Sequence, residues 1–329
     1  MLVKNAIKHY LDNHITLSQK DISAAAKSRE WFLTRIENVI NSRTGEPRLY
    51  PVAGESFVNF GSYFKGTKVS DVDEYDILVV IDSNSGIYSH SGEKIGTGQG
   101  YASPNPKYYK KYFKEDDSGV SPSKMLNWLK SVVDEVVGTF NGEAPIRDGQ
   151  AITAIIKSHD LKIDLVPAGI FKDIRGQVFY NIPDGSAKNS WITTAPRLDI
   201  EKLNELSQKR SNFKNIIRIM KRIKDTRRFQ VNSFPIEMSA INYVQHNTWQ
   251  NELFTDTVLS IRHLASLFKN GMIEDMFNPG QNLLSEIDNL DTYSQRLNSI
   301  ADRLVNWNEG SDDQDTVTQK VVACFENTL

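Results

Sequence analysis

Cysteine is almost absent from this chain, because Cys324 is the only one among its 329 residues. A single cysteine cannot form a disulfide within the chain, which excludes a disulfide-stabilised scaffold. A structural zinc module and zinc-dependent DNA binding are also excluded, because the histidines are scattered and give no zinc site of ordinary spacing with Cys324. The six histidines are His9, His14, His90, His159, His246 and His263.

Long apolar segments and a strong net charge are missing as well. No run of about 18 apolar residues occurs, and the N-terminal Met1–Lys4 stretch becomes polar too soon for an export signal. We therefore expect a soluble, cytoplasmic protein without a membrane partner. The formal net charge of −2 disfavours a basic coat for duplex nucleic acid. With 39% hydrophobic residues, the chain can still build a sizeable core.

The most informative segment that is present contains two alternating carboxylates, Glu74 and Asp76, at the start of the apolar run Ile77–Ile81. On an extended strand, side chains two residues apart point to the same face. Two carboxylates on one face repel each other unless a cation lies between them. The pattern therefore predicts a divalent metal site.

A Gly-Ser pair, Gly61 and Ser62, precedes Glu74 by a twelve-residue step. Glycine lets the backbone approach a phosphate closely, and the serine hydroxyl adds a donor beside exposed amide groups. Nucleotidyl transfer needs phosphate-binding groups next to metal ions that neutralise the triphosphate and stabilise the leaving pyrophosphate. The order of turn, carboxylates and strand is typical of a nucleotidyltransferase site.

A third carboxylate is expected on a neighbouring strand. Residues 151–157 and 161–166 are two apolar runs around 158–160, which predicts a hairpin. Asp164 is the lone acid in the second run, and a buried carboxylate needs a partner. We predict Asp164 as the third metal ligand and as the group that orients or deprotonates the acceptor hydroxyl.

Simpler interpretations compete with this one. A Gly-Ser pair alone is usually a turn, and an acid-x-acid pair alone is usually a solvated strand end. Asp71, Asp73 and Asp82 also lie nearby in the sequence and compete for the ligand role. Asp71 and Asp73 are expected in a connecting loop, because the uninterrupted apolar run starts only after Asp76.

Helical periodicity occurs in two segments before residue 140 and through most of the chain after Asp199. Ser18 and Asp21 resemble a capping box before an amphipathic helix over 19–42, and Ser121-Pro122 starts a helix that ends near Gly138. After Asp199 the pattern predicts helices at about 200–228, 235–247, 253–269, 282–307 and 316–326, with an acidic, mobile tail at 309–315 and a break at 278–280. Strands before residue 195 and helices after it indicate an α+β protein.

Three segments admit more than one interpretation. Residues 209–228 hold nine basic side chains and one acid, so they could form an RNA-binding surface. We favour a helix with one basic face toward a triphosphate. Gly96–Gly100 is unlike a working dinucleotide fingerprint, because no helix follows it. The basic and aromatic run Lys107–Lys114 fits a nucleobase-stacking lid or partner surface, and we favour an ordered loop over the sheet.

Together these motifs resemble the cGAS/DncV-like nucleotidyltransferases, the bacterial CD-NTases and their animal relatives. The resemblance covers roughly residues 20–300. It rests on the Gly-Ser turn, the Glu-Tyr-Asp-Ile strand and the later segments 163–168, 180–183, Trp191, Pro196, 216–224 and 233–237. The vertebrate DNA sensor of this group carries a zinc thumb, and this chain has none.

The resemblance implies a polymerase-β-like core, a mixed β-sheet with a long spine helix, over residues 1–195. It also implies a helical lobe over 196–329 that closes the nucleotide cleft. Two Mg²⁺ ions, replaceable by Mn²⁺, would be held by Glu74, Asp76 and Asp164. Phosphate contacts would come from Gly61 and Ser62, and donor triphosphate contacts from Lys221 and Ser233.

The expected activity is Mg²⁺-dependent joining of nucleoside triphosphates, ATP above all, into a cyclic di- or trinucleotide second messenger for antiviral or anti-phage signalling. An activating protein or RNA ligand is a further expected partner class. A linear 2′-5′ oligoadenylate synthase or a terminal transferase is the first alternative. A nucleotide- or RNA-binding pseudoenzyme is the second, and the three retained carboxylates argue against it.

Overall fold

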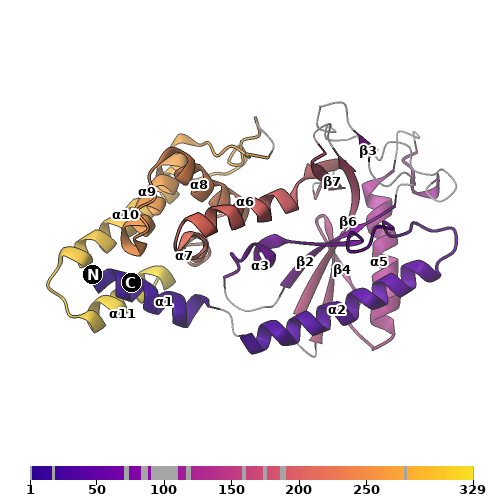
Figure 1. Cartoon of the computed structure of the whole chain (residues 1–329), viewed down its shortest axis with the longest axis horizontal. Coiled ribbons are helices and arrows are strands. Elements are labelled where there is room, and N and C mark those ends of the chain that lie inside the picture. Colours follow the sequence, from indigo (N-terminus) through magenta and orange to yellow (C-terminus); the bar gives the residue numbers. More distant parts are fainter. Residues whose placement is uncertain are drawn as a thin grey trace. The chain divides into compact units, whose positions relative to one another are not determined.

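Contacts between elements divide this chain into two units. The computed structural model describes residues 2–16, 19–69, 74–82, 88–89, 110–115, 120–157, 161–172, 176–185, 190–277 and 280–328 (Figure 1). The sheet unit comprises residues 18–64 and 71–200, and the helical unit comprises residues 1–17, 65–70 and 201–329. The predicted division at 195–196 lies near the change at 200–201. The N-terminal residues and the 65–70 segment, by contrast, group with the helices.

The sheet unit is built on the long strand β6 (Leu161–Lys172). Strand β2 (Glu74–Val80) runs parallel to β6, and β5 (Ala151–Ile156) runs antiparallel to its other edge. The order is completed by β1 (Phe57–Phe60) beside β2 and β4 (Ile146–Asp148) beside β5. The predicted hairpin is thus confirmed, although residues 158–160 at its turn lie outside the described residues.

Beyond this core, β6 continues into further pairing. Its later residues pair with β3 (Tyr88–Ser89) and β7 (Val178–Pro183), and β7 pairs with β8 (Trp191–Thr194). Trp191 at the start of β8 is buried, and its indole Nε1 donates a hydrogen bond to the carbonyl of Val120 at 2.8 Å. The bond links β8 to the start of helix α5.

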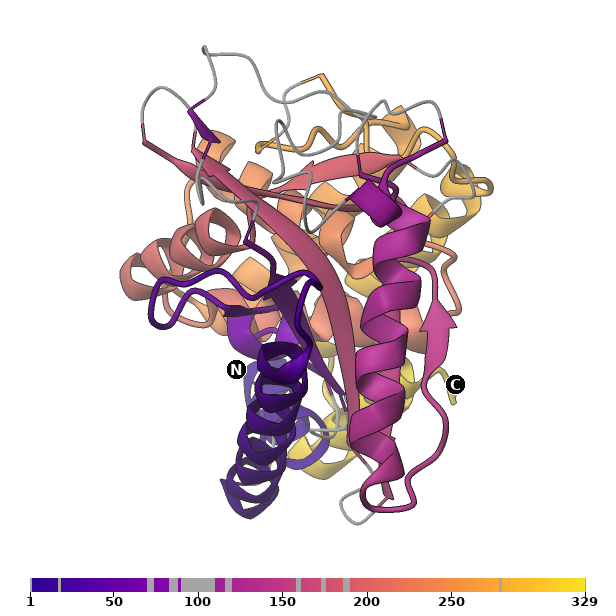
Figure 2. The ribbon, with the colours of Figure 1, turned by 90° about the vertical axis from the view of Figure 1, so that its right-hand side faces the viewer.

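Two helices of the sheet unit confirm the sequence predictions. Helix α2 (Gln19–Ser42) is the predicted spine helix, and α5 (Pro122–Gly138) begins where the Ser-Pro pair indicates. The Ser121 hydroxyl accepts a hydrogen bond from the backbone N–H of Lys124, as an N-cap does. Helix α5 contacts α2, β5 and β6, and Figure 2 shows α2 and α5 running beside each other. The predicted capping residue Ser18 lies outside the described residues.

The helical unit has one large apolar core. The N-terminal α1 (Leu2–Tyr10) and its continuation η1 (Leu11–Ile15) pack against the C-terminal α11 (Gln314–Glu326) and α7 (Phe213–Thr226). The other helices are α8 (Ser233–His246), α9 (Leu253–Asn270) and α10 (Leu290–Glu309), and the division at 200–201 falls within α6 (Pro196–Lys209). Among the described residues, no helix is both long and apolar enough to span a bilayer.

Three predicted features of the C-terminal half differ from the structure. The single helix predicted over 200–228 is two helices, because Asn212 takes a left-handed backbone with φ of 61°. The helix predicted from residue 282 begins only at Leu290, after a series of turns. The acidic 309–315 segment is ordered at its end, where the Asp313 carboxylate caps α11 by accepting from the backbone N–H of Thr316.

Two of the segments with competing interpretations lie wholly or partly outside the described residues. Residues 96–100 and 107–109 lie outside the described residues. The next residues form a short 3-10 helix, η2 (Lys110–Tyr112), in which Lys111 and Tyr112 both donate to the carboxylate of Glu46. Tyr112 is buried. This visible part of the run therefore packs as an ordered loop.

A buried ionic cluster in the helical unit holds the segment that follows the Gly-Ser turn. Glu237 of α8 accepts hydrogen bonds from Lys65 at 2.8 Å, from Thr67 at 2.7 Å and from Lys221 of α7 at 2.5 Å. Lys221 also donates to the Thr67 hydroxyl at 2.9 Å. Burial alone would raise the pKa of Glu237, yet the two ammonium groups lower it to about 2. One carboxylate therefore anchors residues 65–67 to two helices.

We expect Glu237→Gln to lower the free energy of unfolding by about 3–5 kcal/mol, because it leaves two buried ammonium groups without a counter-charge. Urea denaturation followed by circular dichroism measures this loss. Glu205→Gln is the matched control, since Glu205 also accepts from two lysines, Lys202 and Lys209, but on an exposed surface. Equal, small effects of the two substitutions would contradict the anchoring role.

Candidate active site

The three predicted carboxylates meet at one place in the sheet unit. Glu74 and Asp76 lie on β2, Asp164 lies on β6, and the parallel register sets Asp76 directly opposite Asp164. One ligand atom from each of the three lies within 4.8 Å of the others, and all three residues are half-buried. Carboxylate oxygens gathered in this way fit a hard divalent cation such as Mg²⁺.

The pKa of Asp164 is raised well above its ordinary value. Burial raises its pKa, the Thr153 hydroxyl opposes the rise by donating a hydrogen bond at 2.5 Å, and repulsion from Glu74 adds to it. The outcome is a pKa of about 6. The carboxylate is thus destabilised in its ionised form as long as no positive charge is present. A bound cation would remove that cost.

Gly61 is required next to this cluster for a reason that the sequence did not reveal. It begins the short helix α3 (Gly61–Lys65) with a φ of +78°. A Cβ atom added at this position would lie 1.7 Å from Oδ2 of Asp76. Only glycine leaves room for the carboxylate, so the Gly-Ser turn and strand β2 are packed directly against each other.

The opposite face of β2 is packed with aromatic side chains. Tyr75 is fully buried between Glu74 and Asp76 in sequence, which confirms the predicted alternation. Its ring centroid lies 4.7 Å from that of Tyr63 and 5.6 Å from that of Phe64, both on α3. The guanidinium of Arg29 on α2 lies 5.0 Å from the Tyr75 centroid. These contacts fix α3 and the spine helix behind the carboxylates.

Two supporting residues were missed by the sequence analysis. Thr153 on β5 pairs with Asp164 in the antiparallel register, and Asp148 on β4 contributes to the repulsion that raises the Asp164 pKa. The available signal was Thr153 as a polar residue inside the apolar run 151–157. Without the register of the hairpin, however, nothing in the sequence connects it to Asp164.

The other predicted site residues belong to the helical unit or lie outside the description. Ser233 is the first residue of α8 and is half-buried. Lys221 is buried, and its ammonium is paired with Glu237, so its predicted triphosphate contact stays a prediction, as does that of Ser233. Asp82 follows the end of β2, whereas Asp71 and Asp73 lie outside the described residues.

Known proteins resemble this chain in sequence and fold. Residues 63–189 match the Mab-21 protein nucleotidyltransferase domain. A Bacillus cereus (strain VD146) protein named "Probable cyclic nucleotide synthase" is 24% identical over 325 residues, which cover 98% of this chain and 88% of that protein. Two structures of E. coli MS115-1 CdnC, one with ATP and one in complex with HORMA-deltaN, are also similar. Each has a TM-score of 0.68 at 13% identity, covering 98% of this chain and 96% of CdnC, so the predicted polymerase-β-like α+β fold is confirmed.

We expect Gly61→Ala to weaken Mn²⁺ binding by at least about tenfold, because the added methyl group would displace the carboxylate of Asp76. Isothermal titration calorimetry with Mn²⁺ measures the change. Gly54→Ala is the matched control: Gly54 has a similar φ of +75° but nothing within 4 Å of an added Cβ. An equal loss in both variants would assign the effect to backbone strain and contradict the steric explanation.

Asp164→Asn should stabilise the metal-free protein above about pH 6 by about 1 kcal/mol, a value that allows for partial solvent screening. The folded pKa of about 6 lies above the ordinary value, so the ionised carboxylate costs stability once the pH rises through 6. The gain should vanish near about pH 4, where the carboxyl is protonated. Urea denaturation in EDTA at both pH values, with the exposed Asp134→Asn as control, tests this. Destabilisation at the higher pH would contradict it.

Proposed function

We propose that this chain, which resembles the cGAS/DncV-like nucleotidyltransferases, joins nucleoside triphosphates into a cyclic oligonucleotide. The observation that carries this proposal is the cluster of Glu74, Asp76 and Asp164 on adjacent strands, packed against Gly61. The match to a nucleotidyltransferase domain supports an enzyme of the nucleotidyltransferase class. The name of the Bacillus cereus protein supports a cyclic product.

The three carboxylates would hold two Mg²⁺ ions, and Mn²⁺ would substitute for them. Bound there, the ions would neutralise the triphosphate and lower the pKa of the attacking ribose hydroxyl. Asp164 would accept a hydrogen bond from that hydroxyl while Thr153 holds its other oxygen. Backbone N–H groups at Gly61 and Ser62 would donate to phosphate oxygens. The α-phosphate would then form a bond to the ribose oxygen and lose pyrophosphate.

We propose the substrate and the partner of this chain from the two CdnC structures. One CdnC structure contains ATP, which supports ATP as a substrate of this chain. Another is a complex with HORMA-deltaN, which supports a protein partner for this chain. We propose that the product serves as a second messenger in antiviral or anti-phage signalling, the role that the family resemblance implies.

The test is mass spectrometry of products from all four nucleoside triphosphates with Mg²⁺, after phosphatase treatment. We expect pyrophosphate release and a phosphatase-resistant product, because a closed ring has no terminal phosphate. Asp76→Asn should lower turnover by at least about a hundredfold without changing the fold, since it removes a metal ligand. Asp134→Asn, an exposed acid paired with Lys130, should retain activity.

Three results would contradict parts of this proposal. A phosphatase-sensitive ladder that requires duplex RNA would indicate a linear synthase. ATP binding without pyrophosphate release under Mg²⁺ or Mn²⁺ would indicate a pseudoenzyme. Full turnover by Asp76→Asn would refute the site itself.

A further inference from the structure

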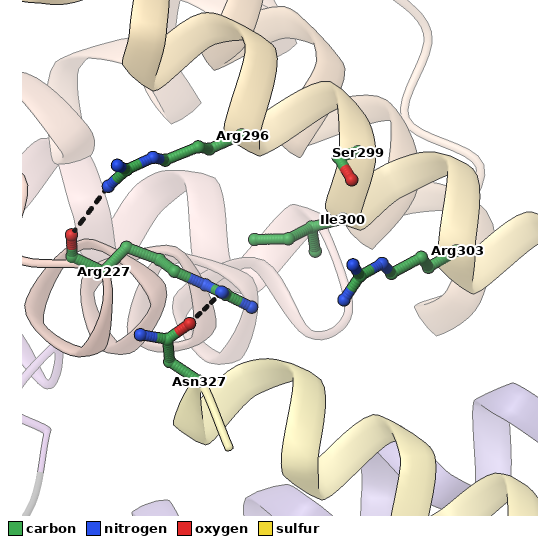
Figure 3. A pocket seen from close by; sticks show the side chains of 6 residues that line it. All are labelled: Arg227, Arg296, Ser299, Ile300, Arg303 and Asn327. Atoms are coloured by element: carbon green, nitrogen blue, oxygen red, sulfur yellow. Dashed lines mark hydrogen bonds between the residues drawn. The ribbon is translucent and has the colours of Figure 1, made fainter. Parts of the chain in front are cut away.

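A pocket of about 370 Å³ in the helical unit is lined by three arginines (Figure 3). Arg296 and Arg303 lie on α10 with Ser299 and Ile300 between them, at the spacing that places all four on one face of the helix. Arg227 and Asn327 complete the lining from the residues that end α7 and α11. Every lining residue belongs to the helical unit, so the pocket shares no residue with the carboxylate cluster of the sheet unit.

In the part of the chain that the structure describes, no acidic side chain balances this charge. Among the described residues, no carboxylate lies within ion-pair distance of Arg227, Arg296 or Arg303. The acids that lie near these arginines in the sequence are engaged elsewhere. Asp302 pairs with Arg262 at 2.9 Å, Glu326 pairs with Arg222, and Asp225 pairs with Lys224 at 2.6 Å.

The contacts that the arginines do make are with neutral groups. Arg227 donates to the backbone carbonyl of Cys324 at 2.7 Å and to the side-chain oxygen of Asn327, and Arg296 reaches the carbonyl of Arg227 at 3.5 Å. The Nε atom of Arg227 is buried without a hydrogen-bond partner. Burial raises the pKa of the neighbouring Cys324 thiol, which stays neutral and offsets no charge.

Three guanidinium groups facing one pocket repel each other in the absence of an anion. Guanidinium forks match phosphate oxygens in shape and charge better than any other side chain does. A volume of about 370 Å³ lies at the lower end of the usual range for small-ligand pockets, about 300–1,000 Å³, which favours a compact ligand.

We propose that this pocket binds a small phosphate-bearing ligand, with a diphosphate or triphosphate group between Arg227, Arg296 and Arg303. Ser299 and Asn327 supply neutral hydrogen-bond donors beside the three charges. Such a ligand joins α10 to the C-terminal ends of α7 and α11. The proposal does not depend on the catalytic proposal, since a phosphate site here stands whether or not the carboxylates perform nucleotidyl transfer.

Isothermal titration calorimetry in EDTA, with pyrophosphate in one series and ATP in another, tests the site. The protein carries Asp76→Asn, so that the metal cluster cannot contribute to binding. Adding Arg296→Gln and Arg303→Gln should weaken binding by at least about tenfold, because two charged contacts are lost. Both side chains are exposed, so the fold should survive. Arg262→Gln, which removes one positive charge from α9 outside the pocket, should bind as tightly as its parent.

Comparing the affinities for pyrophosphate and ATP shows whether the pocket recognises a free phosphate or a nucleotide. Pyrophosphate binding as tight as that of ATP indicates that the pocket recognises phosphate alone, whereas tighter binding of ATP indicates that it recognises a nucleotide. Either result supports the proposal if the double substitution weakens that binding by at least about tenfold. Unchanged affinity in the double variant, or an equal loss with Arg262→Gln, overturns it. Hydrogen–deuterium exchange of the unmodified protein gives a second readout, because pyrophosphate should protect α10 and the ends of α7 and α11. Absence of protection at saturating pyrophosphate also overturns it.

Discussion

Repulsion among three carboxylates is the constraint on which the sheet unit depends. The parallel pairing of β2 with β6 sets Asp76 opposite Asp164, and Glu74 lies on the same face two residues earlier. Without a cation, burial and repulsion keep the pKa of Asp164 at about 6. The aromatic packing around Tyr75 holds the three repelling carboxylates in place, and the missing side chain at Gly61 leaves room for the carboxylate of Asp76. Such stored electrostatic cost is typical of a site that a metal completes.

The helical unit also contains a buried carboxylate, but there the charge is compensated by neighbouring side chains. Its buried carboxylate, Glu237, is surrounded by Lys65, Lys221 and Thr67, so its charge is compensated within the protein. Since residues 65–67 begin at the last residue of α3, this ion cluster ties the chain just after the Gly-Ser turn to α7 and α8. The arginine pocket at the C-terminal end of α7 has no carboxylate of the described residues within ion-pair distance, and the proposed partner there is an external anion.

The sequence predicted that the three carboxylates come together, because its signals for them are local. Alternation on a strand places Glu74 and Asp76 on one face, and an acid inside an apolar run marks Asp164. Interactions that depend on strand register or on segments distant in the sequence could not be predicted. They are the hydrogen bond from Thr153 to Asp164, the contact of Gly61 with Asp76, and the pairing of Lys221 with Glu237. Helix positions were predicted well where caps are present, as at Ser121, and poorly at Asn212, where a left-handed residue divides an otherwise continuous pattern.

The central claim is that Glu74, Asp76 and Asp164 form one divalent cation site. Anomalous diffraction from crystals grown with Mn²⁺ tests it most directly, because the ion is located independently of any assumed activity. The account predicts a strong Mn²⁺ peak bonded to oxygens of all three carboxylates. A peak that avoids Asp164, or no peak at the cluster at saturating Mn²⁺, would contradict it.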